Sequence, residues 1–331
     1  MLLVLAGCAT TPSLPPRNQQ VTRAREALLR RADADSLAAA AMMAPGGPSW
    51  VTVDPTAALS TIGRAAKLAP QRPDLALLHL AVCTHRIECD PRPLEMRLLA
   101  LDPANGVPWV GALSRASSSG RANDREHALA ELGRASRFDF YGNTLYARLA
   151  SAAIKTKLID PDLAVAAVGN GLTRAGVFGF GPMGFGAVID ACKTDSVQSE
   201  TMISCLKIAK ALRRSDDVVT ELLGDSMTLS LYDPASPEAR SAVESRRLLD
   251  YRTSIMRMPT DLSAAATYKT VRRMAKYPRQ QDSLLAEIRE AGKNPIPPPD
   301  WTPSSKASTP TSACKRPSGC PSATIAVEVS P

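Results

Sequence analysis

Apolar positions recur every three or four residues along most of the chain, which is the period of an amphipathic helix. The segment 21–43 is rich in Ala, Leu and Arg, which favour helix, and Pro and Gly residues end it at 44–48. Val, Ile and Thr seldom form alternating runs, which argues against an all-β sandwich or barrel. Further helix starts are predicted at Asp54-Pro55, Asp160-Pro161 and Asp216-Asp217. The pattern predicts an all-α protein.

Residues 54–140 repeat one helical spacing. It is carried by Ala58, Ile62, Ala65 and Pro70 and again by Ala128, Leu132 and Ala135. This spacing resembles the second helix of a tetratricopeptide (TPR) repeat, and Pro103 follows Pro70 by 33 residues, close to the TPR period of about 34. The resemblance implies antiparallel helix hairpins stacked into a solenoid or superhelical array. The inward positions would be Ala58, Ile62, Ala65, Leu98, Leu132 and Ala135. Because Pro91 and Glu95 depart from the TPR pattern, generic helix hairpins remain the alternative.

The chain divides by composition into a helical body and a C-terminal tail. Helical repeats are expected over 21–140 and further helices over 141–293. A Gly- and Phe-rich insert at 169–186 contains seven glycines. From residue 294 to 331 the chain holds nine prolines and seven serines, so this segment is predicted to be a disordered tail.

The N-terminus is a short apolar run that ends in a cysteine. Leu5-Ala6-Gly7-Cys8 resembles a bacterial lipobox, which makes 1–7 a signal-peptide remnant and 8–20 a lipidated cysteine with its flexible tether. The resemblance implies a diacylglyceryl group on the Cys8 sulfur and an acylated α-amine. Ala9 stands where that family places Asp in inner-membrane proteins, which implies an outer-membrane anchor facing the periplasm. No basic residue precedes the apolar run, so we expect the true start upstream; a chance apolar N-terminus is the alternative.

The cysteine count agrees with an exported protein. Once Cys8 is assigned to the lipid, six of the seven cysteines remain. They form three local pairs in the sequence, Cys83 with Cys89, Cys192 with Cys205, and Cys314 with Cys320. Disulfides persist in oxidising compartments, and local pairing is the simplest arrangement. For the first pair the alternatives are free thiols or a metal site shared with His79 and His85.

No motif of the sequence identifies a catalytic site. Gly179, Gly181 and Gly184 match GxGxxG, but no strand is predicted before them, so a loop between helices is expected. Alternatively, an apolar lip for a partner is formed by Phe178, Phe180, Met183 and Phe185. Glu244-Ser245 resembles the catalytic pair of lytic transglycosylases, but Arg246-Arg247 follow where that family's motif continues differently. We therefore assign no catalytic residue, metal or cofactor.

Charge completes the functional expectation. The chain has 40 basic and 32 acidic residues, and residues 252–331 hold 12 and 6 of them. An exported lipoprotein rarely meets nucleic acid, so the excess points to anionic envelope polymers or lipid headgroups, or to a solubilising surface. We expect a non-enzymatic, lipid-anchored scaffold that presents a concave helical surface to an envelope protein or peptide. The alternative is a peptidoglycan-active enzyme or an accessory factor of one.

Overall fold

The computed structural model describes residues 15–43, 55–177, 184–193, 199–256 and 263–302. Within these ranges it holds fifteen helices and no strand, which confirms the all-α prediction. The first seven helices are α1 (Arg17–Arg31), α2 (Ala34–Met42), α3 (Pro55–Leu68), α4 (Pro73–Thr84), α5 (Arg92–Leu101), α6 (Val107–Ser118) and α7 (Ala122–Arg134). The others are α8 (Gly142–Ile154), α9 (Pro161–Arg174), α10 (Phe185–Ala191), α11 (Ser199–Leu212), α12 (Val218–Leu231), α13 (Pro237–Ile255), α14 (Ala264–Lys276) and α15 (Gln280–Glu290).

Local capping explains where several helices begin. Pro55 starts α3, Asp160 precedes α9, and Asp217 caps α12 by accepting a hydrogen bond from the Thr220 amide. The prediction of one helix over 21–43 was wrong because the helix breaks at Ala32, whose φ is 56°. Asp33 then caps α2 by accepting a hydrogen bond from the amide of Ser36.

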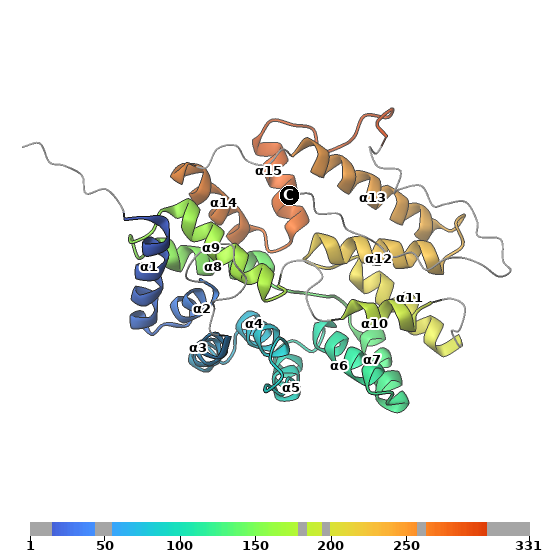
Figure 1. Cartoon of the computed structure of the whole chain (residues 1–331). Coiled ribbons are helices and arrows are strands. Elements are labelled where there is room, and N and C mark those ends of the chain that lie inside the picture. The colour runs from blue at the N-terminus through green and yellow to red at the C-terminus, as the bar shows by residue number, and fades with distance from the viewer. Residues whose placement is uncertain (1–14, 44–54, 178–183, 194–198, 257–262, 303–331) are drawn as a thin grey trace, which may run out of the picture.

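The helices form an array that closes on itself (Figure 1). Each helix from α1 to α6 packs against the next one in the chain. The chain then returns, because α8 and α9 pack on α1 and α2 while α11 packs on α7. The path α11–α12–α13 continues from α7, and α15 joins α13 to α14, which packs on α8 and α9. Helices far apart in sequence therefore become neighbours at the α2–α8 contact.

Aliphatic side chains and three phenylalanines fill the core. Of the six positions predicted to face inward, Ala58, Ile62, Ala65, Leu98 and Leu132 are buried. Ala135 follows the last residue of α7 and is only partly buried. Burial of these faces supplies the stability that such short helices lack alone.

Two segments differ from the prediction, namely the Gly- and Phe-rich insert at 169–186 and the start of the predicted disordered tail at 294–331. Gly169 and Gly171 belong to α9, so the helix continues into the predicted insert. Residues 294–302 lie against α13, where the Trp301 ring contacts Tyr251 at 5.3 Å and Arg247 donates to the Pro298 carbonyl at 3.0 Å. Residues 294–302 therefore do not belong to a disordered tail, and residues 303–331 lie outside the described residues. None of the described helices is long and apolar enough to span a membrane.

Candidate functional site

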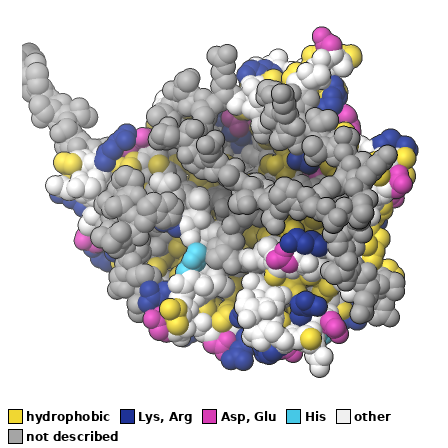
Figure 2. Space-filling view, turned by 45° about the vertical axis from the view of Figure 1, so that its right-hand side comes forward, with side chains coloured by type: hydrophobic (Ala, Val, Ile, Leu, Met, Phe, Trp, Pro, Cys, Tyr) yellow, Lys and Arg dark blue, Asp and Glu magenta, His cyan; other side chains and the backbone are white. Residues whose placement is uncertain are grey.

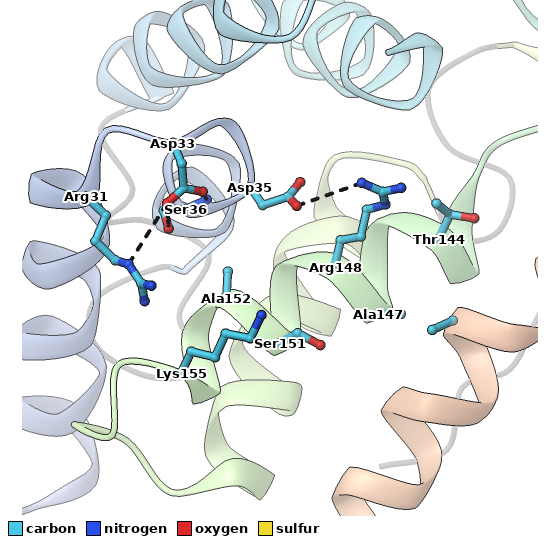
Figure 3. A pocket seen from close by; sticks show the side chains of 11 residues that line it. Arg31, Asp33, Asp35, Ser36, Thr144, Ala147, Arg148, Ser151, Ala152 and Lys155 are labelled. Atoms are coloured by element: carbon cyan, nitrogen blue, oxygen red, sulfur yellow. Dashed lines mark hydrogen bonds and ion pairs between the residues drawn. The ribbon is translucent and has the colours of Figure 1, made fainter.

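A polar pocket of about 500 Å³ lies where the α1–α2 turn faces α8 and α14 (Figure 3). We call it the α2–α8 pocket. Its charged lining residues are Arg31, Asp33, Asp35, Arg148 and Lys155, and its hydroxyl-bearing ones are Ser36, Thr144 and Ser151. Three alanines complete the wall and leave its centre open. The pocket thus joins the beginning of the array to helices that follow it by more than one hundred residues.

Helical spacing explains which side chains line the pocket. On α8, Thr144, Arg148, Ser151 and Lys155 follow one another at intervals of three or four residues, so they share one face. The opposite wall comes from the break between α1 and α2, which places Arg31 and residues 33–36 at the turn. The sequence shows that these four residues share one face of α8, but nothing in the sequence shows that this face lies opposite the turn.

The two carboxylates of the pocket already have partners. Asp33 accepts hydrogen bonds from the Ser36 amide at 2.8 Å and from the Ser36 hydroxyl at 2.6 Å. Burial raises the pKa of Asp33, but these hydrogen bonds outweigh it and hold the pKa below its ordinary value. Asp35 accepts a hydrogen bond from Arg72 at 2.5 Å. Both carboxylates are therefore bound by side chains or amides of the protein itself.

The three cationic side chains of the pocket, Arg31, Arg148 and Lys155, have weaker interactions with acidic partners. The nearest Asp33 oxygen is 4.0 Å from Arg31, and Asp35 is 3.9 Å from Arg148, so both contacts are long. Lys155 has no ion pair or side-chain hydrogen bond among the described residues. In Figure 3 the Lys155 side chain extends from the end of α8 with its nitrogen toward Ser151 in this view. The pocket therefore keeps free hydrogen-bond donors of positive charge.

A second polar cluster lies between α11, α12, α13 and α15. Asp225, which is 1% exposed, accepts a hydrogen bond from Arg213 at 2.7 Å. Glu221 is also buried, and burial raises its pKa to about 7 despite Arg279, whose guanidinium is 3.9 Å away. A neighbouring cavity of about 310 Å³ is lined in part by Glu244 and Ser245. Neither Glu221 nor Asp225 lines that cavity, but Arg213, the hydrogen-bond partner of Asp225, does.

The sequence had pointed to Glu244 and Ser245 of this cluster but not to Glu221. A glutamate in the first turn of a helix is a common N-terminal residue, so nothing in its local pattern marks it as buried. In the fold the start of α15 comes beside it, where Arg279 lies 3.9 Å away.

The cysteine prediction is confirmed for two of the three pairs. Cys83 bonds to Cys89 and Cys192 bonds to Cys205, with sulfur–sulfur distances of 2.00 and 2.03 Å. The first disulfide occupies the sulfur atoms that the alternative metal site with His79 and His85 required. Within the described ranges, no group of three or more His, Cys, Asp or Glu side chains is arranged to hold a metal. Cys8, Cys314 and Cys320 lie outside these ranges.

Of the four residues of the predicted apolar lip, Phe185 belongs to the described part of the chain. Phe178, Phe180 and Met183 lie outside the described residues, as do Gly179 and Gly181. Phe185 is 4% exposed, and its ring lies 6.0 Å from that of Phe138 and 6.3 Å from that of Phe140. Phe185 is thus a core residue and does not present its ring to a partner.

Of the described basic residues from 252 onward, Lys269, Arg273 and Arg279 form ion pairs with acidic side chains. Arg273 is buried between Glu287, at 2.7 Å, and Glu290, at 3.5 Å. On the face shown in Figure 2, Lys and Arg side chains are interspersed with Asp and Glu and form no single basic patch. The α2–α8 pocket is therefore the better candidate for a ligand site than the charge of this face.

Comparisons of the chain with protein-family models, with curated proteins and with solved structures give no match. The class that the structure defines is a closed array of helices with one polar pocket between its first and its middle helices.

Proposed function

We propose that the protein is a lipid-anchored, non-enzymatic binding module of the bacterial cell envelope, which holds a protein or peptide partner in the α2–α8 pocket. The observation that carries the proposal is the pocket itself, whose cations lack close partners. Side chains of a few residues fit a cavity of about 500 Å³.

The proposed location rests on the N-terminal resemblance and on the disulfides. The lipobox-like Leu5-Ala6-Gly7-Cys8 supports an acyl anchor at Cys8, and Ala9 supports the outer membrane with the protein facing the periplasm. The two disulfides agree with an oxidising compartment.

Binding fits the α2–α8 pocket better than catalysis does. A hydrolytic site needs a nucleophile held against a general base. The Ser36 hydroxyl is hydrogen-bonded to Asp33, but that carboxylate also caps α2, and no His or Cys belongs to the described lining. The arrangement supplies recognition by charge and by hydrogen bonds.

The alternative function is a peptidoglycan-active enzyme or an accessory factor. The observation in its favour is the second polar cluster, where a carboxyl with a pKa of about 7 lies near a cavity lined by Glu244 and Ser245. Purified protein that cleaves peptidoglycan, and that loses this activity in Glu244→Gln, would favour the enzyme over the binding module.

Occlusion of the pocket tests the proposed function. Ser151→Trp places a large ring in the cavity without changing its charge, and Ser118→Trp on exposed α6 surface is the matched control. Each purified variant is immobilised and incubated with detergent-solubilised envelopes of the source bacterium. We expect wild type and Ser118→Trp to capture the same partner and Ser151→Trp to lose it. Equal capture by all three would overturn the assignment of this pocket.

A further inference from the structure

We propose that the α2–α8 pocket binds a carboxylate of an acidic peptide through Arg31, Arg148 and Lys155. The proposal rests on the proposed function, because it names the chemistry of the partner in the same pocket. It follows from which charges in the pocket are already satisfied and which are not.

The acidic side of the pocket has little capacity for a cationic ligand. One carboxylate, Asp33, accepts two hydrogen bonds from Ser36 in the cap of α2. The other, Asp35, is paired with Arg72, which itself is only one-fifth exposed and is fixed by a second carboxylate, Asp74, at 2.5 Å. A cationic group would have to displace these internal partners.

The cationic side chains of the pocket have hydrogen-bond donors that no acidic side chain accepts at close range. Arg148 is half exposed, and its contact with Asp35 is 3.9 Å, beyond ordinary hydrogen-bond length, because Arg72 holds the same carboxylate at 2.5 Å. Arg31 stands 4.0 Å from Asp33, and Lys155 has no acidic partner among the described residues. Guanidinium and ammonium groups around one cavity are the donors that bind carboxylates through charge-assisted hydrogen bonds.

The charge balance selects a singly charged group. Three cations and two carboxylates line the cavity, which leaves one net positive charge. A peptide carboxylate would neutralise it, whereas a doubly charged phosphate would add repulsion from Asp33 and Asp35. The hydroxyls of Thr144 and Ser151, which make no side-chain hydrogen bond within the described chain, lie on the same wall and add neutral donors.

Peptide selection tests the proposal with defined probes. The immobilised full chain is incubated with two random hexapeptide libraries, one amidated and one with a free C-terminal carboxylate, both acetylated at the N-terminus. Retained peptides are sequenced by mass spectrometry. Enrichment of Asp and Glu in the amidated library indicates side-chain recognition, and retention of the free-carboxylate library alone indicates C-terminal recognition; either result supports the proposal.

The charge variant is Arg148→Gln/Lys155→Gln, and Lys210→Gln on the exposed face of α11 is the control. We expect about a tenfold loss of acidic-peptide retention in the double variant, no loss in the control, and weaker retention by wild type at high salt. The carboxylate proposal would be overturned if the protein retained neutral peptides, Ser151→Trp abolished that retention and the double variant kept it. That result would leave the binding function in place. Retention unchanged in Ser151→Trp would overturn both.

Discussion

Gly171 sits at the closest approach between α9 and the end of α2, the contact that helps bring the middle of the chain back to its beginning. A Cβ atom added to Gly171 would lie 2.1 Å from the carbonyl oxygen of Met42 and 2.8 Å from its carbonyl carbon. Because both atoms belong to the backbone, no rotamer change relieves the overlap. We therefore predict that Gly171→Ala destabilises the protein.

Two effects of opposite sign decide how much Gly171→Ala changes the free energy of unfolding. Replacing Gly by Ala inside a helix stabilises it by about 1 kcal/mol. Against this, α9 and α2 must separate by about 1 Å to restore van der Waals contact, and forcing extra atoms into a packed contact costs about 1–3 kcal/mol or more. The steric term wins because the obstacle is backbone, and we expect a net loss of up to about 2 kcal/mol.

Gly186 provides the matched control. It lies in α10, and a Cβ added there meets nothing within 4 Å, so Gly186→Ala is expected to gain up to about 1 kcal/mol. Free energies of unfolding from urea titrations of wild type and both variants give the comparison. If Gly171→Ala is as stable as wild type or more so, the close approach of α9 to α2 is wrong.

Three further substitutions and one labelling experiment have expected outcomes. Ala65→Glu puts a carboxylate into a fully buried position, so we expect a loss of about 2–4 kcal/mol in the free energy of unfolding; an unchanged melting temperature would contradict that packing. Cys8→Ala, expressed with its full native signal, is expected to abolish acylation, and membrane partition that persists would argue against the lipobox. Thiol labelling of denatured, unreduced protein from the envelope should leave Cys83, Cys89, Cys192 and Cys205 unmodified, and labelling of any of them would contradict the disulfides. Because burial raises the pKa of Glu221 to about 7, the contribution of this residue to stability is full below about pH 4.5 and is lost as the pH rises through 7. Glu221→Gln should therefore reduce the fall in the free energy of unfolding between about pH 5 and pH 8 by about 1–3 kcal/mol. An identical fall in the variant and the wild type would refute this.

The sequence alone determined features that depend on neighbouring residues. Helix periodicity predicted the all-α class, and capping residues such as Asp217 predicted helix starts. The spacing of Ala58, Ile62 and Ala65 predicted a buried stripe, because residues three and four apart share one helix face. Local cysteine pairs were also predictable, since the chain between them is short.

The tertiary structure alone decided where the chain turns back on itself. The sequence predicted a solenoid or superhelical array, but it did not predict that α8 returns to α2, which places Arg148 opposite the turn at Arg31. The close approach at Gly171 and the contact of buried Glu221 with Arg279, at the start of α15, have the same origin. Each depends on which helix faces meet across a long separation in the chain, and local periodicity carries no information about that choice because the same apolar stripe packs on any complementary face.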